Sequence, residues 1–203
     1  MIDTAQKKPG QAGDSVVAAN AIESTGDTTV GSYAAAPVLP GANGSSNPPV
    51  VPADLDALKK EGPIIPVAGV ALKDLYDSFD DARGGGTRKH QALDIMAARN
   101  TPVLSALPGV LLKFHNSVAG GLTIYASDPS NRYVLMYGHL DSYRPGLKEG
   151  VALTKGEIIG FVGSTGDASP NAPHLHIAIT RNDNVKEWWK GTPLNPFLVY
   201  RSK

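Results

Sequence analysis

The chain has 203 residues, which is enough for one ordinary domain and an additional segment. Its 19 Lys and Arg residues balance its 19 Asp and Glu residues, so the net charge gives no indication of a nucleic-acid partner or an anionic membrane. The sequence contains no cysteine, which excludes disulfides, a cysteine nucleophile and thiolate zinc sites, and a metal site would therefore need histidine and carboxylate ligands.

Residues 1–62 are predicted to form a low-complexity, flexible arm or linker. They are rich in Ala, Gly, Ser, Thr, Asn and Pro and contain no histidine or tryptophan. Such a stretch buries too little apolar surface to offset the entropy lost on ordering it. One short helix is predicted inside the arm, in ADLDALKKEG, where Asp54 is the expected N-cap and Gly62 follows the last helical residue.

Residues 63–203 are predicted to form one β-rich domain of mostly antiparallel sheet. Residues 70–81 are ambiguous, because their leucine spacing suits a helix and their context suits a strand. Residues 101–116 indicate two strands broken at Leu-Pro-Gly, and residues 120–140 indicate a hairpin with its turn at Asp-Pro-Ser-Asn. Residues 157–167 and 174–180 are predicted to be a further strand pair. Short strands at close intervals with few helical signals favour this fold class.

The segment SPNAPHLHIAI places two of the chain's five histidines one residue apart. Because successive side chains of a strand point to opposite faces, His174 and His176 would share one face there. Apolar residues would form the other face. Two imidazoles on one rigid face can both bind a metal, or one can bind a metal while the other transfers a proton. An isolated pair can equally be two polar residues on a solvated strand face.

Two other segments add residues of the same chemistry. The segment KHQALDIMA carries His90 and Asp94 four residues apart, and YGHLD places His139 after a strand and a glycine. Catalytic zinc sites typically use three nitrogen or oxygen ligands and leave a fourth position open. Two histidines with one aspartate meet that requirement and leave two histidines for acid–base chemistry.

HQALD, YGHLD and PHLHIAI, in this order, resemble the three motifs of the lysostaphin/LytM-type zinc metallopeptidases, which cleave peptide bonds in bacterial peptidoglycan. The resemblance covers roughly residues 64–200. It implies one Zn²⁺ per chain bound by His90, Asp94 and His176. It also implies that His139 and His174 are catalytic, serving as acid, base and oxyanion-stabilising groups beside a zinc-activated water.

This resemblance predicts a zinc-dependent endopeptidase whose partner is a peptidoglycan peptide in the cell envelope, periplasmic or secreted. Residues 1–10 lack the apolar core of a secretory signal, so either the protein is not exported by that route or the signal has been removed. No run approaches the ~20 apolar residues of a membrane span. The sequence gives no indication of the oligomeric state.

Three alternatives are open. A non-catalytic LytM-like regulator or binding module would typically lack some metal ligands, whereas this chain lacks none. A peptidoglycan carboxypeptidase would need a cation for a free carboxylate, and Arg83, Arg88 and Arg132 are candidates. In a third alternative, the arm folds over the cleft and keeps the enzyme latent.

Other residues have competing interpretations. His115 matches no motif and is interpreted as a surface or hydrogen-bonded histidine. Residues 83–86, an arginine followed by three glycines, are predicted to form a loop before the first ligand. Trp188 and Trp189 are interpreted as packing residues rather than a substrate rim. Asp141 can orient an imidazole or serve as an ordinary surface acid.

Overall fold

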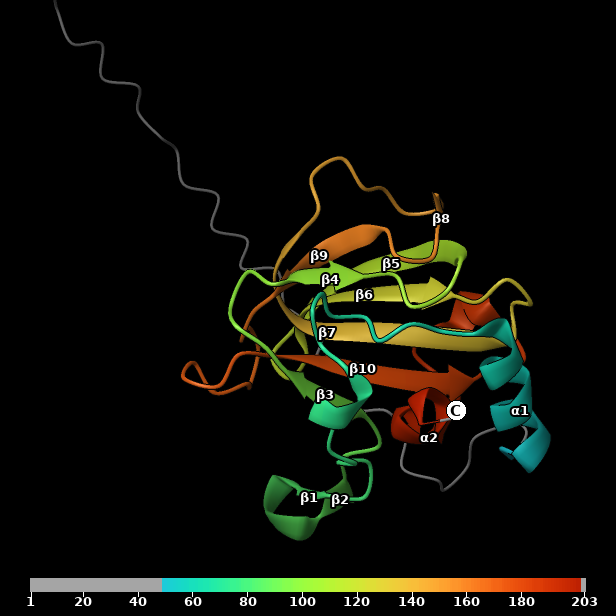
Figure 1. The fold of residues 1–203 in the computed structure, drawn as a ribbon, viewed down its shortest axis with the longest axis horizontal. Coiled ribbons are helices and arrows are strands. Elements are labelled where there is room, and N and C mark those ends of the chain that lie inside the picture. Colours follow the sequence, from blue (N-terminus) through green and yellow to red (C-terminus); the bar gives the residue numbers. More distant parts are fainter. Residues whose placement is uncertain (1–48, 202–203) are drawn as a thin grey trace, which may run out of the picture. The chain divides into compact units, whose positions relative to one another are not determined.

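The computed structural model describes residues 49–201, which belong to one structural unit (Figure 1). Residues 1–48, and with them most of the predicted arm, lie outside the described residues. The arm and its boundary at residue 62 therefore remain predictions. None of the helices in the described part of the chain is long and apolar enough to span a membrane.

Strands dominate the described residues. The strands are β1 Ala82–Arg83, β2 Arg88–Lys89, β3 Leu93–Met96, β4 Pro102–Leu104, β5 Gly109–Ser117, β6 Gly121–Ser127, β7 Tyr133–Tyr143, β8 Ala152–Leu153, β9 Ile158–Val162, β10 His174–Arg181 and β11 Thr192–Leu194. The helices are α1 Pro52–Glu61 and α2 Pro196–Tyr200, with single 3₁₀ turns at Leu72–Asp74, Gly84–Gly86 and Val185–Glu187. The predicted class, a mostly antiparallel β-sheet domain, is confirmed.

Nine of these strands form one sheet and β1 and β2 form a separate small hairpin (Figure 1). The main strand order is β11-β10-β7-β6-β5-β8, while β3 pairs with the outer edge of β10 and β9 pairs with both β7 and β4. The β6–β7 hairpin confirms the hairpin predicted over residues 120–140, and β4 and β5 confirm the two strands predicted over residues 101–116.

The predicted pairing of residues 157–167 with residues 174–180 is wrong. Strand β9 pairs with β4 and β7, and only a single bridge, between Gly163 and His174, joins it to β10. The reason is the length of β7, whose first half pairs with β10 and whose second half pairs with β9. Residues 70–81, ambiguous from sequence, contain one short 3₁₀ turn and otherwise no helix or strand.

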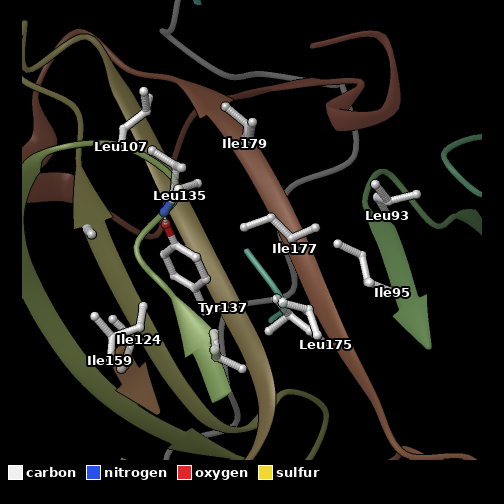
Figure 2. Close-up of a cluster of buried hydrophobic side chains, with 14 of the residues drawn as sticks. Leu93, Ile95, Leu107, Ile124, Leu135, Tyr137, Ile159, Leu175, Ile177 and Ile179 are labelled. Atoms are coloured by element: carbon white, nitrogen blue, oxygen red, sulfur yellow. Dashed lines mark hydrogen bonds between the residues drawn. The ribbon is translucent and has the colours of Figure 1, made fainter. Parts of the chain in front are cut away.

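The hydrophobic core lies against one face of the sheet (Figure 2). Leu175, Ile177 and Ile179 follow one another at alternate positions of β10, and all three side chains are fully buried. Tyr137 of β7 packs beside them, and its hydroxyl oxygen accepts a hydrogen bond of 3.0 Å from the Ala106 N–H. This alternation leaves the intervening positions of β10 on the opposite face, as the sequence predicted.

A β-bulge in β7 reverses the alternation where the strand reaches His139. Tyr137 and Leu140 are three residues apart and would normally face opposite sides, yet both are buried in the core. The β6–β7 register shifts at this point, and His139 has a left-handed φ of 58°. Bulges of this kind re-aim side chains next to functional sites. Here the bulge places the imidazole on the face opposite the core.

Helix α1 differs from its prediction at its first turn. Val51 is the N-cap and Pro52 begins the helix, whereas Asp54 lies at the third helical position. Its carboxylate accepts a hydrogen bond of 2.9 Å from the Val51 N–H, so it still satisfies a free amide of the first turn. Proline is well suited to the first helical position because its φ is already helical and it lacks the N–H. Gly62 ends the helix with a φ of 66°, as predicted.

The same carboxylate attaches α1 to the sheet. Asp54 is 3% exposed and lies 2.9 Å from the Tyr133 hydroxyl and 3.2 Å from Arg181 Nε. Burial alone would raise the pKa of Asp54, but these hydrogen bonds and the nearby arginines outweigh burial and lower it. The carboxylate therefore stabilises the folded state at neutral pH, and this contribution is lost as the pH falls through the lowered pKa.

Replacing Asp54 with alanine is expected to destabilise the protein by about 1–3 kcal/mol, because the buried hydroxyl of Tyr133 would lose its hydrogen-bond partner and Arg181 would lose one of its acids. Urea unfolding followed by circular dichroism measures the change. Asp56→Ala is the control, since Asp56 is exposed on the same helix and should change stability by less than about 0.5 kcal/mol. Equal effects of the two substitutions would contradict the role assigned to Asp54.

Candidate metal centre and active site

The sheet register brings together residues that are distant in the sequence. In the β3–β10 ladder, Asp94 lies directly opposite His176. On the other side of β10, Gly138 of β7 lies opposite His176, and His139 follows it. His174 is two residues from His176 on the same face of β10. The residue positions predicted from three separate motifs thus meet on one face of the sheet.

His90, Asp94 and His176 form a cluster that could hold a metal ion, with all three ligand atoms within 4.8 Å of one another. His90 Nε2 lies 3.0 Å from Asp94 Oδ1 and 3.0 Å from His176 Nδ1. His176 Nδ1 lies 3.1 Å from the same carboxylate oxygen. Nitrogen and oxygen atoms converging in this way are the donor set that zinc prefers in catalytic sites.

The backbone fixes the orientation of His90. Its Nδ1 lies 2.9 Å from the carbonyl oxygen of Ser78, which accepts a hydrogen bond from it. This contact directs Nε2 at Asp94 Oδ1 and His176 Nδ1, so the three ligand atoms converge on one point and the residues fit a bound metal ion.

Asp94 and His176 are held in the protonation states that metal binding requires. Burial opposes the charge of Asp94, but hydrogen bonds with His176 and His90 outweigh burial and hold the pKa of this carboxyl far below its usual range. Burial lowers the pKa of His176. A charged carboxylate and a neutral imidazole are the forms of these side chains that donate electron pairs to a metal.

His139 and His174 are arranged alike beside this cluster. Nδ1 of His139 lies 2.8 Å from the carbonyl oxygen of Thr165, and Nδ1 of His174 lies 2.9 Å from that of Ala172. Each Nδ1 therefore donates a hydrogen bond to a carbonyl. Nε2 of His174 lies 3.7 Å from Asp94 Oδ1. The centroids of the two rings are 4.9 Å apart. Burial and the neighbouring His176 lower the pKa of His139 to about 4, so this ring is neutral at pH 7.

Several supporting residues escaped sequence reasoning. The Asp94 N–H donates a hydrogen bond of 3.1 Å to the hydroxyl of Ser78, whose carbonyl also fixes His90. Arg83, which the sequence offered as a candidate for binding a free carboxylate of a substrate, instead donates a hydrogen bond of 2.8 Å to Asp94 Oδ2. Carbonyl groups such as that of Thr165 carry no sequence signal, because every residue has one. The contact of Arg83 with a metal ligand has no sequence signal beyond its proximity to the first motif.

Replacing Arg83 with alanine is expected to weaken metal binding about 10- to 100-fold, the usual effect of removing a partner of a metal ligand. Arg83 hydrogen-bonds Oδ2 of Asp94, so that Oδ1 faces the two histidines. Without Arg83 the carboxylate is free to rotate. Competition with a chromophoric chelator measures the affinity directly. Unchanged affinity in the folded variant would show that Arg83 does not position the ligand.

Other residues considered from sequence lie elsewhere. Asp141 is paired with Arg99 rather than with an imidazole. Trp188 packs on Tyr125 with ring centroids 4.4 Å apart, and His115 lies beside the same indole, which favours the packing interpretation of this tryptophan. Residues 84–86 form the 3₁₀ turn between β1 and β2, so the predicted loop is the tip of a small hairpin.

Two cavities meet at the cluster. The larger cavity has a volume of about 580 Å³ and the smaller cavity a volume of about 290 Å³. The residues that line both are Arg88, His90, His139, Asp167 and His176. One wall is the β1–β2 hairpin and the other is the loop before β10. The arrangement provides space for an extended substrate on either side of the histidines.

An antiparallel sheet that carries two histidines and an aspartate as a potential metal group, with two further histidines in the same cleft, defines a metallopeptidase of the lysostaphin type. A family model for peptidase family M23 matches residues 88–196. That match covers more than half of the chain, which therefore belongs to peptidase family M23, a family of peptide hydrolases. The resemblance drawn from the three motifs is confirmed.

Curated relatives agree with this assignment. The chain is 35% identical over 117 residues to an L-Ala–D-Glu endopeptidase of Bacillus subtilis, a match that covers 55% of this chain and 36% of the relative. It is 32% identical over 126 residues to the cell division protein DipM of Caulobacter vibrioides, covering 62% of this chain and 19% of that protein. The chain thus spans about a third or less of the length of these relatives.

Solved structures share the fold. The catalytic domain of the antimicrobial peptidase lysostaphin from Staphylococcus simulans is similar with a TM-score of 0.50 and 25% identity, covering 73% of this chain and 98% of that domain. A LytM-type protein from Ruminococcus gnavus is similar with a TM-score of 0.57 and 27% identity, covering 71% of this chain and 61% of that chain.

Proposed function

We propose that this protein is a zinc-dependent endopeptidase that hydrolyses peptide cross-links or stem peptides of bacterial peptidoglycan. The observation that carries the proposal is the meeting of five side chains in one cleft: His90, Asp94 and His176 as metal ligands, with His139 and His174 beside them. The name of the Bacillus relative, an L-Ala–D-Glu endopeptidase, supports the substrate class. The proposal places the protein in the cell envelope, periplasmic or secreted.

A metal ion bound by the three ligands would supply a Lewis acid that polarises the scissile carbonyl and acidifies water. The other steps belong to the chain. In this proposal Nε2 of His139 or of His174 accepts a proton from the attacking water, because the carbonyls of Thr165 and Ala172 occupy Nδ1 of both rings. The resulting imidazolium stabilises the oxyanion of the tetrahedral intermediate and protonates the leaving amine.

A non-catalytic regulator is the weaker alternative, because every ligand and both further histidines are present and lie together. A carboxypeptidase activity is compatible with the same centre. The name of a third relative, the DD-carboxypeptidase/endopeptidase Mpg of Neisseria meningitidis, joins the two activities in one protein. It is 31% identical to this chain over 112 residues, covering 55% of this chain and 23% of the relative.

Mass spectrometry of digested peptidoglycan tests the proposal. Purified walls with diamino-acid links and with glycine bridges are incubated with the zinc-loaded protein and with its His176→Ala variant. New peptide termini made only by the unaltered protein are expected, and their masses identify the bond. No new products from either wall, with one zinc bound per chain, would favour the regulatory alternative.

A further inference from the structure

The basic side chains around the cleft differ in whether the protein itself neutralises them. Arg83 is paired with Asp94 at 2.8 Å, and Lys89 is paired with Asp80 at 2.6 Å. Arg88, between them on the hairpin, is exposed and forms no ion pair or side-chain hydrogen bond with any described residue. Of the cations that line the two cavities, Arg88 is thus the one in the described chain that is left without an acidic partner.

The position of Arg88 is fixed by the hairpin and the first motif. It lies opposite Arg83 in the β1–β2 ladder and two residues before His90. Arg88 and His90 both line both cavities, so Arg88 borders the space directly beside the metal ligands. Apart from Arg88 and the histidines, the one acidic or basic residue common to both cavities among the described residues is Asp167, and it forms no ion pair with Arg88 there.

The geometry points to Arg88 as the residue that binds a carboxylate of the substrate next to the scissile bond. This inference rests on the proposed function and specifies its substrate: a peptide that carries a free carboxylate within one or two residues of the cleaved amide. A guanidinium presents a planar fork of N–H donors that matches a carboxylate, and it is always charged. The carboxylate can be the one left free by a γ-linked glutamate inside the stem, or the carboxyl terminus of the peptide.

Four synthetic stem peptides of sequence L-Ala–γ-D-Glu–L-Lys–D-Ala, whose lysine adds no further carboxylate, distinguish these sources. One has both carboxylates free, one has the glutamate carboxylate amidated, one has the C-terminus amidated, and one has both amidated. The protein is expected to lose roughly 10- to 100-fold in kcat/KM, mainly through KM, when the recognised carboxylate is amidated. Arg88→Gln should reduce kcat/KM by the same factor on the peptide with free carboxylates. It should cause no further reduction on the peptide whose recognised carboxylate is amidated.

Two variants serve as controls, one for the planar guanidinium and one for the positive charge. Arg88→Lys keeps the positive charge and should recover only part of the loss, because the ammonium lacks the bidentate fork. Lys148→Gln removes one exposed positive charge from the β7–β8 loop and should leave all four peptides unaffected. Equal losses on free and amidated peptides in Arg88→Gln, or no loss on any of them, would overturn the assignment.

Calorimetric binding of the four peptides to the zinc-loaded His174→Ala variant, with and without Arg88→Gln, separates the two proposals. If a peptide with one free carboxylate binds more tightly than its amide, and Arg88→Gln removes this difference, the inference about Arg88 is supported. This holds even if the unaltered protein cleaves no peptide, a result that would count only against the proposed endopeptidase activity. If all four peptides are cleaved and bind with affinities that do not depend on amidation, the role of Arg88 is wrong and the proposed endopeptidase activity is unaffected.

Discussion

Alanine in place of His90 is expected to remove the bound metal and abolish peptide hydrolysis, reducing kcat/KM by about 10³-fold or more. The substitution deletes one of three ligand atoms that converge within 4.8 Å and leaves two, too few for a structured catalytic site. Metal content by inductively coupled plasma mass spectrometry and cleavage of purified peptidoglycan are measured on the same preparation. The ratio of zinc to chain should fall from about one toward zero.

His115→Ala is the matched control, because it also removes a histidine but from the aromatic cluster with Trp188 and Tyr125 rather than from the metal cluster. It should keep both zinc and activity. If His90→Ala retained one zinc per chain, the ligand assignment of His90 would be wrong, and if it retained activity without zinc, the chemistry would not depend on this metal site.

Alanine at His139 or at His174 is expected to produce the opposite combination, with zinc retained and cleavage reduced by about 10²- to 10⁴-fold. Each ring has its Nδ1 fixed by a backbone carbonyl, and neither ring belongs to the three-residue metal cluster. The measurement again pairs metal content with turnover. Loss of zinc from either variant would show that the division between ligands and catalytic groups is wrong.

His139 needs a second substitution, because its φ of 58° is unfavourable for alanine. Asparagine tolerates this left-handed conformation, so His139→Asn removes the imidazole while limiting backbone strain. Equal losses of activity in the alanine and asparagine variants, with similar midpoints of thermal unfolding, would assign the effect to the missing imidazole. Recovery of activity in the asparagine variant would assign it to the backbone.

The parts of the fold that depend on local patterns could be predicted from the sequence. Alternation placed His174 and His176 on one face of β10 and Ile177 on the other, and the turn residues located the β6–β7 hairpin. The pairing of β9 with β4 and β7 was missed, because strand neighbours depend on the length of β7, which no local pattern encodes. Motif order alone indicated that the histidines belong together.

The geometry of the site depended on features without a sequence signal. The bulge that turns His139 into the cleft comes from an extra residue in β7, and simple alternation would have placed this ring in the core. The role of Arg83 and the isolation of Arg88 follow from which acids the fold brings near them. Asp54 was expected at the N-cap, but Pro52 begins the helix earlier and shifts Asp54 into the first turn.

Titration of metal-free protein with zinc while peptide release from peptidoglycan is followed tests the central claim most directly, because it joins the metal cluster to the chemistry in one measurement. Cleavage should be absent after chelation, rise in proportion to added zinc and level off at one zinc per chain. Cleavage that persists in protein stripped of metal, or no cleavage when one zinc is bound per chain, would contradict the account.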